Sequence, residues 1–106
     1  MLKITIRPQA NLDIEDHVTY LAEQNEDRAF RFFDSVRETF ADFARMPGIG
    51  RRYLNPTKPD LNLHQWAVRD FRNYLVFYRI RETEIEIVRV LPAVRDFDSI
   101  LGRESP

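Results

Sequence analysis

The chain has 106 residues, of which 43% are hydrophobic and 12% aromatic. A chain of this length buries about two-thirds of the surface that it exposes when unfolded, which is enough for one hydrophobic core, so we expect a single domain over residues 1–106. The sequence contains no cysteine and only two histidines. This composition excludes a disulfide framework and a zinc site built on thiolates, and we expect no cofactor.

The formal net charge of −1 hides an uneven distribution of charge along the chain. Residues 1–44 hold five Lys or Arg and nine Asp or Glu, whereas residues 45–106 hold eleven and eight. A near-neutral total argues against a protein that coats nucleic acid by charge alone, because that mode needs many phosphate contacts. A local basic surface on the C-terminal half is compatible with these counts. No segment resembles a signal peptide or a membrane span, and we expect a cytoplasmic protein.

The N-terminal half predicts a strand followed by two helices. Residues 2–7 alternate apolar and polar side chains, as a short strand does, and Pro8 suits the first turn of a helix. From Gln9 to Glu23, apolar side chains recur at helical spacing on one stripe, and three carboxylates lie off it. The apolar residues are Ala10, Ile14, Val18 and Leu21, and the carboxylates are Asp13, Asp16 and Glu23.

A second helix is predicted from a cap at Asn25 to about Met46, with Glu26 and Asp27 complementing its dipole. Its expected buried stripe is Ala29, Phe33, Val36, Phe40 and Phe43. Phe30 and Phe32 are left over from this stripe. They either show a hydrophobic surface to a partner or cover the edges of the sheet. The short link between the two helices favours an antiparallel hairpin.

The C-terminal half predicts a loop and then strands. Pro47 to Gly50 stops the second helix, and the segment through Asp60 is rich in turn-forming residues. We expect three strands and a last helical turn, at Leu63–Val68, Asn73–Ile80, Glu84–Leu91 and Asp96–Leu101. Ile85 and Ile87 alternate regularly, but Val88 and Val90 fall on the opposite face. A β-bulge, or burial of both faces, would explain this change.

The sequence contains no residue pattern typical of a metal site or a nucleophilic triad. His17 and His64 stand in different predicted elements without a carboxylate cluster, and no serine has a nearby histidine, so neither a metal site nor a nucleophilic triad is expected. The remaining group is cationic, on or beside adjacent strands: Arg69, Arg72, Arg79, Arg81, Arg89 and Arg95, interleaved with Trp66, Tyr74 and Tyr78. Such residues can hold phosphates and stack bases. Ion pairing with nearby carboxylates is the stronger interpretation of the pattern alone: Glu82, Glu84, Glu86, Asp96 and Asp98 are available.

Several short motifs follow one another along the chain. They are Ala10-x-x-Asp13-Ile14, Met46-Pro47-x-x-Gly50, Asn73 to Arg79, Ile85-x-Ile87-x-Arg89-Val90-Leu91 and Arg95-Asp96. Each motif is weak alone, but their order and spacing resemble the ParE branch of the ParE/RelE family of bacterial type II toxins. The resemblance implies an α+β fold with an N-terminal strand and an antiparallel helical hairpin packed on a twisted, mostly antiparallel sheet.

The resemblance also implies a partner. Toxins of this kind are held inactive by an antitoxin, in ParE modules a ParD-like protein whose N-terminal part binds DNA and whose C-terminal part wraps the toxin. The toxin would then contact DNA only indirectly, through its antitoxin. The candidate antitoxin-binding residues are Phe30, Phe32, Tyr20 and Trp66.

Members of the family differ in their target. RelE-like toxins cut messenger RNA on the ribosome, whereas ParE-like toxins inhibit DNA gyrase without chemistry of their own. This chain has Pro92 where many relatives carry a histidine, and Phe97 and the C-terminal residues supply no tyrosine or histidine acid. A proton carrier contributes about a hundred-fold or more to rate, so we expect no ribonuclease activity and predict gyrase inhibition.

Residues that would bind the target are predicted among the arginines: Arg72, Arg79, Arg89 and Arg95. Two alternatives stay open at this point. One is a ribosome-dependent mRNA endoribonuclease that uses Arg79, Arg89 and His64. The other is a family member that binds an antitoxin but is not toxic.

Overall fold

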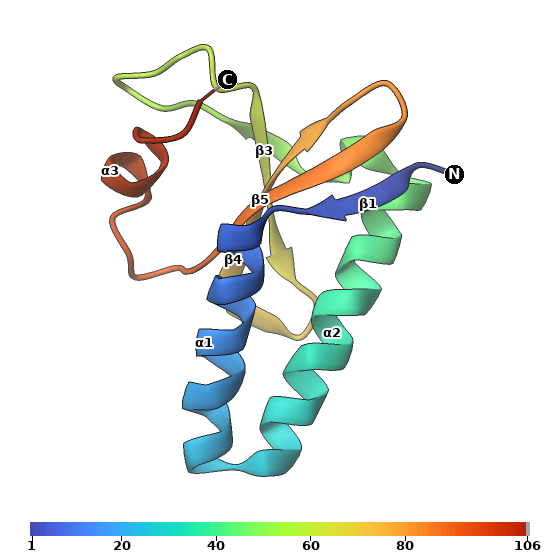
Figure 1. Cartoon of the computed structure of the whole chain (residues 1–106), viewed down its shortest axis with the longest axis vertical. Helices are drawn as coiled ribbons and strands as arrows, with labels where there is room; N and C mark the ends of the chain where they lie inside the picture. Colours follow the sequence, from blue (N-terminus) through green and yellow to red (C-terminus); the bar gives the residue numbers. More distant parts are fainter. Residues whose placement is uncertain (106) are drawn as a thin grey trace.

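The computed structural model describes residues 1–105, which fold into five strands, three α-helices and one short 3-10 helix. In chain order these are β1 (Lys3–Ile6), α1 (Pro8–Gln24), α2 (Glu26–Arg45), η1 (Pro47–Ile49), β2 (Arg51–Tyr53), β3 (Leu63–Val68), β4 (Phe71–Ile80), β5 (Glu84–Pro92) and α3 (Phe97–Leu101). Figure 1 shows the long hairpin of α1 and α2 beside the sheet, with α3 near the C-terminus.

The strands form one sheet in the order β1-β5-β4-β3-β2. β1 runs parallel to β5, and the other neighbouring pairs are antiparallel. The helical hairpin follows β1 at one edge and precedes β2 at the other edge (Figure 1). The predicted architecture, a helical hairpin on a mostly antiparallel sheet, is confirmed.

Local sequence signals explain where the two long helices begin. Pro8 occupies the first turn of α1, where its missing N–H costs nothing. The side chain of Asn25 caps α2 by accepting a hydrogen bond from the Arg28 backbone N–H at 3.1 Å. Both starts agree with the sequence prediction. No helix within residues 1–105 is long and apolar enough to cross a membrane.

The buried face of α2 contains a different phenylalanine from the predicted one, and it also includes Ser35, Thr39 and Ala44. Phe32 is completely buried, with its ring 5.2 Å from that of Phe71 and 4.8 Å from that of Tyr74, whereas Phe33 is 46% exposed. The prediction that Phe33 belongs to the buried stripe is therefore wrong, and Phe32, which was left over from the stripe, takes its place. Spacings of three and four residues both keep a helical stripe, so periodicity alone could not choose between the two.

Asp13 also departs from the prediction that placed it off the buried stripe of α1. It is only 6% exposed and lies against β5. A buried carboxylate needs partners, and this one has them in Arg89 and in the backbone of Val90. The contact is across 76 residues of chain, which no local pattern reveals.

The strands differ from the prediction in two places. β2 was expected to be loop, but Arg51 to Tyr53 pair with Leu63 to Gln65. β4 begins at Phe71, two residues before the predicted start, because Phe71 pairs with Val68 across a tight turn. Three residues are too short for a recognisable alternation, and the pairing with β3 rather than local propensity makes β2 a strand.

The change of face in β5 has both of the explanations offered above. Phe77 pairs with Arg89 and Tyr78 with Ile87, so Val88 is the extra residue of a β-bulge. Both faces of β5 are also buried. Ile85, Ile87 and Val90 pack into the cluster under the helices, whereas Val88 and Leu91 pack into a second cluster on the other face.

Polar contacts attach α3 and the 54–62 loop to this second face. Buried Asn55 donates to the backbone carbonyl of Asp98 at 3.0 Å, and the Tyr53 hydroxyl donates to the Asp98 carboxylate at 2.5 Å. The guanidinium of Arg79, 2% exposed, bonds the Leu61 carbonyl, the Glu86 carboxylate and the Ser105 carbonyl. These bonds add to the apolar contacts that Leu61 and Leu101 make in the second cluster.

Candidate functional site

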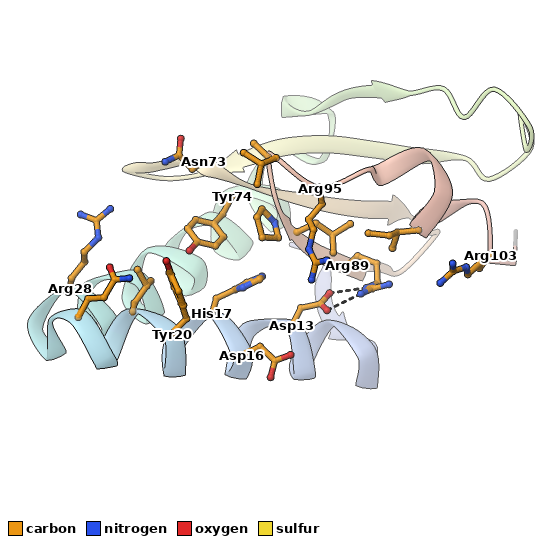
Figure 2. A pocket seen from close by; sticks show the side chains of 17 residues that line it. Asp13, Asp16, His17, Tyr20, Arg28, Asn73, Tyr74, Arg89, Arg95 and Arg103 are labelled. Carbon is orange, nitrogen blue, oxygen red and sulfur yellow. Dashed lines mark hydrogen bonds and ion pairs between the residues drawn. The ribbon is translucent and has the colours of Figure 1, made fainter.

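A cleft of about 810 Å³ runs along α1, between this helix and the ends of β4 and β5. Its wall on one side is α1 and the start of α2, and its wall on the other is the stretch from Leu91 to Arg95 with part of the C-terminal segment. Figure 2 shows Tyr20, His17 and Tyr74 pointing into the space between the two walls, whereas Asp16 and Asn73 point away from it. The cleft combines aromatic and charged side chains from α1, α2, β4, β5 and the C-terminal segment.

An ion pair closes one end of the cleft floor. Arg89 donates from Nε and Nη2 to the two carboxylate oxygens of Asp13, at 2.8 and 2.9 Å (Figure 2). These hydrogen bonds, more than the accompanying charge attraction, raise the pKa of the Arg89 guanidinium. The pair is bidentate and largely buried, so Arg89 is fixed in place rather than free for a ligand.

Two side chains of α1 satisfy the backbone of Val90 on β5. The Asp13 carboxylate accepts from the Val90 N–H at 3.0 Å, and Nε2 of His17 lies 2.7 Å from the Val90 carbonyl. β1 pairs with β5 only through Ile87, so this stretch of β5 has no neighbouring strand on that side. Asp13 and His17, one helical turn apart, therefore take the place of a strand partner.

Aromatic rings form the middle of the cleft. The His17 ring lies 4.9 Å from that of Tyr74, which in turn packs on buried Phe32. Burial, with a smaller contribution from Tyr20, raises the pKa of the Tyr74 hydroxyl. Tyr20 is 57% exposed and faces Tyr74 across the cleft (Figure 2). The middle therefore offers a flat apolar surface with two hydroxyl groups.

Three exposed arginines surround this aromatic surface. Arg28 lies at one end, with its guanidinium 5.1 Å from the centre of the Phe71 ring. Arg95 lies over the middle of the cleft, and Arg103 lies at the other end (Figure 2). None of the three guanidiniums has a hydrogen bond or ion pair to a side chain within residues 1–105. Asp16 is the one lining carboxylate without such a partner in the same range, so the rim is net positive.

The family model described as "ParE toxin of type II toxin-antitoxin system, parDE" matches residues 4–97. The chain belongs to the ParE toxin family. Among solved structures, the chain is similar to one from the "Chromosomal ParDE TA system from P. aeruginosa", with a TM-score of 0.66 and 14% sequence identity over 87% of this chain and 96% of that one. At this identity the likeness concerns the fold. A search of curated proteins finds no match.

The arginines predicted to bind the target of this ParE family member divide into two pairs. Arg79 is buried and Arg89 is held by Asp13, so neither guanidinium is available to a ligand in this structure. Arg72 and Arg95 are exposed, and their side chains have no polar partner in the described part of the chain. The expected ion pairing is real, but the partners of Arg69 and Arg89 lie on the helices rather than on neighbouring strands.

The aromatic candidates for antitoxin binding are not brought together. Tyr20 lies in the cleft, and Phe30 is 70% exposed on α2. Trp66 lines a separate hollow of about 890 Å³ at the β3–β4 hairpin, which also contains Arg72. Phe32 is buried and offers no surface to a partner.

Most residues of the cleft were not predicted as site residues, and among these are Asp13, His17, Arg28 and Arg103. Asp13 belongs to the quoted family motif, which was the only signal in the sequence. No pattern in the sequence marks His17 or Arg28 as a site residue, because each belongs to the cleft only through its position beside β4 and β5.

The other histidine, His64, lies on β3 and stacks on Tyr78. Burial, and to a lesser extent Arg52, lowers its pKa, and its Nδ1 is buried without a hydrogen-bond partner in the described residues. Within residues 1–105 no group of three or more His, Cys, Asp or Glu side chains could hold a metal ion.

Proposed function

We propose that this ParE family member inhibits DNA gyrase by binding it, and that a bound ParD-like antitoxin keeps the toxin inactive. The family match over residues 4–97 is the observation that carries the proposal. Both partners would meet the toxin in the cytoplasm, and DNA would be contacted only through the antitoxin.

The state of the arginines supports binding rather than RNA cleavage. A ribonuclease of the RelE kind needs free cations for the phosphate and groups that transfer protons. The guanidiniums of Arg79 and Arg89 are already bonded to protein acceptors. Pro92, at the end of β5, carries no proton that could be transferred. His64 stacks on Tyr78 with one nitrogen buried, away from Arg89 and its partner Asp13 on α1.

Arg72 and Arg95 remain as target-binding residues of the proposed toxin. Both are exposed, and Arg95 follows β5 on a short turn closed by the Arg95 N–H to Pro92 carbonyl bond at 3.0 Å. Positive side chains held on short turns suit recognition of an acidic protein surface. Each exposed contact is expected to contribute a few-fold to affinity.

The proposal is tested by inducing the chain in a bacterium and following DNA synthesis and protein synthesis separately, and by adding purified protein to a gyrase supercoiling assay. We expect DNA synthesis to stop first and supercoiling to be inhibited. Arg72→Ala and Arg95→Ala should each weaken inhibition by about threefold to tenfold. Arg37→Ala, an exposed change on α2, is the matched control.

Two outcomes contradict the proposal. Prompt arrest of translation with cleaved transcripts would identify a ribonuclease. Unchanged growth, together with binding of the antitoxin, would identify a family member that is not toxic.

A further inference from the structure

We infer that the edge of β3 beside the β3–β4 turn binds an acidic, extended segment of the proposed target, gyrase. The segment adds a short strand at Ala67 and places an apolar side chain against Trp66. This inference rests on the proposed function, because it names the surface of the toxin that meets gyrase. That surface is the hollow of about 890 Å³ that contains Trp66 and Arg72, and it has no described lining residue in common with the cleft beside α1.

β3 has an open backbone edge on the side of this hollow. β2 pairs with β3 only as far as Gln65, so within residues 1–105 no strand lies beside Trp66 to Val68 on this side. The Gln65 carbonyl points to this side, because a Cβ on Gly50 would lie 2.8 Å from it. Backbone groups of alternate residues point the same way along an antiparallel strand, so the N–H and carbonyl of Ala67 face this side too. An extended segment can pair with these groups.

The cleft beside α1 differs from this edge in its backbone. There the N–H and carbonyl of Val90 are already bonded to two side chains of α1. The edge of β3 is open from Gln65 until Arg69, whose N–H donates to the Thr39 hydroxyl at 2.9 Å. This length is about 13 Å at 3.3 Å per residue, which is enough for a strand of about three or four residues. An added strand is therefore possible at β3 and excluded at Val90.

Trp66 provides the apolar part of the hollow. Its side chain is 41% exposed, and half-buried Ile49 and Leu75 also line the hollow. Tryptophan and arginine are the residues that most often contribute the largest share of binding energy at a protein interface. The indole ring of Trp66 therefore suits an apolar side chain of the added segment.

The free charges around the hollow select an acidic segment. Arg51 and Arg72 are exposed, and neither guanidinium has a hydrogen bond or ion pair to a side chain within residues 1–105. The carboxylate of Asp42 is already paired with Arg69 at 2.8 Å, which leaves Asp70 as the one unpaired carboxylate of the described lining. A second copy of the chain on this edge would bring like charges together, whereas Asp or Glu side chains complement them.

The shape of β4 brings Arg72 to the hollow. Ala67 pairs with Leu75, but the next residue of β3, Val68, pairs with Phe71, so residues 72–74 of β4 have no partner on β3. Such a bulge bends a strand and redirects its side chains. The side chain of Arg72 thereby lines the same hollow as the free edge of β3.

The first experiment measures binding of purified toxin to gyrase at about 0.15 M NaCl. Trp66→Ala and Arg72→Glu should each weaken binding by about tenfold, and Arg72→Glu combined with Arg51→Glu by about a hundred-fold. The matched controls are Phe33→Ala and Arg37→Glu, an exposed aromatic and an exposed arginine on α2, and these should bind as the unchanged toxin does. Raising the salt should weaken the unchanged toxin more than the doubly charge-reversed variant.

A proline tests the added strand. Ala67→Pro removes the N–H that faces the hollow and spares the bonds between β3 and β4, as proline does on an edge strand. We expect gyrase binding to weaken by about tenfold. Ala67→Ser keeps the N–H and should bind as the unchanged toxin does. Thermal unfolding of both variants shows whether each one is folded.

Trp66 is the only tryptophan of the chain, so it can report on its own surroundings without a substitution. Toxin made with 5-hydroxytryptophan is excited at wavelengths that the tryptophans of gyrase do not absorb, and quenching by acrylamide then measures the exposure of residue 66. We expect saturating gyrase to lower this quenching by about threefold or more, because contacts around a buried anchor exclude water. In Trp66→Phe combined with Phe33→Trp the probe lies on α2, and its quenching should not change.

The outcomes separate the inference from the function on which it rests. A toxin that inhibits gyrase while the quenching of residue 66 is unchanged, or while Ala67→Pro binds equally well, overturns the inference and leaves the proposed function standing. Protection of residue 66 by the antitoxin and not by gyrase, or by raising the toxin concentration alone, also overturns it. A toxin that neither binds nor inhibits gyrase overturns both.

Discussion

The two faces of the sheet are covered in different ways. On one face, α1 and α2 contribute long apolar stripes, and the cluster beneath them includes Phe32, Phe40 and Phe43. On the other face, the 54–62 loop and the five-residue α3 cover Phe77, Val88 and Leu91. The first cover is continuous in sequence and apolar, whereas the second is made of short pieces joined by Asn55, Tyr53 and Arg79.

This difference shows that the two covers are held on the sheet by different interactions. A helical hairpin that buries aromatic side chains needs no polar attachment, because the apolar area removed from water holds it. Short segments bury less, so their positions depend on hydrogen bonds between buried groups. The cleft lies between the two covers, where α1 faces the C-terminal segment. α1 reaches β5 through a buried ion pair, and the C-terminal segment supplies Arg95 and Arg103.

The largest expected effect is on the helical face. Phe32→Ala should lower the free energy of unfolding by about 3 to 5 kcal/mol, because it leaves a cavity against Phe71 and Tyr74. Phe33→Ala, the adjacent and half-exposed ring, should cost less than about 1 kcal/mol. Urea unfolding of both variants measures the difference. Equal losses would mean that the buried stripe of α2 has been assigned to the wrong phenylalanine.

On the opposite face, Arg79→Ala should cost about 3 kcal/mol, because the carbonyls of Leu61 and Ser105 lose a charged donor. Glu86 keeps Arg81, so no carboxylate is left alone. Hydrogen exchange should accelerate in residues 54–62 and 97–105 before it does in α1 and α2. The exposed Arg81→Ala is the control, and faster exchange spread evenly over both faces would contradict a local attachment.

A smaller effect is expected where α1 meets β5. Asp13→Asn removes the charge that pairs with Arg89 and should lower the free energy of unfolding by about 2 kcal/mol. Asp16 lies on the same helix and has no polar partner in the described residues, so Asp16→Asn should be neutral within about 0.5 kcal/mol. Thermal unfolding at neutral pH compares the two variants. A neutral result for Asp13→Asn would show that packing alone holds α1 against β5.

The smallest effect depends on pH. Burial, and then its bond to Asp98, raises the pKa of Tyr53 to about 12 from a usual value of 10. The folded state therefore holds the proton more tightly than the unfolded state, so this contribution to stability is complete below about pH 10 and is lost between pH 10 and 12. Tyr53→Phe should cost about 1 kcal/mol at pH 8 and much less at pH 11.

Urea unfolding at these two pH values provides the measurement for Tyr53. Tyr20→Phe, which removes an exposed hydroxyl, controls for the number of ionisable tyrosines. A gap between the unchanged protein and Tyr53→Phe that is the same at both pH values would show that the hydroxyl does not titrate in this range.

Much of the fold followed from local chemistry. The starts of α1 and α2 were predicted because Pro8 and Asn25 act on the backbone next to them. The long strands β4 and β5 were predicted from β-branched and aromatic runs, and the bulge at Val88 showed itself as a break in alternation. β2 was missed because three residues carry too little pattern, and only its pairing with β3 makes it a strand.

The candidate site was harder to predict than the fold. Sequence alone identified Tyr20 and Arg95 individually, and the family motif contained Asp13. It could not show that Arg79 is buried or that Arg89 is occupied, because each state depends on contacts with distant segments. A row of arginines in a sequence looks the same whether the side chains pair inward or face solvent.

By itself, the sequence determined the family, the helical hairpin and the mostly antiparallel sheet, because these depend on periodicity, caps and motif order over short distances. Only the tertiary structure decided which phenylalanine of α2 is buried, which arginines are free, and that Asp13 and His17 close the edge of β5. These features arise where α1, β5 and the C-terminal segment meet. Contacts between residues more than 70 positions apart are set by packing, and packing has no local signature.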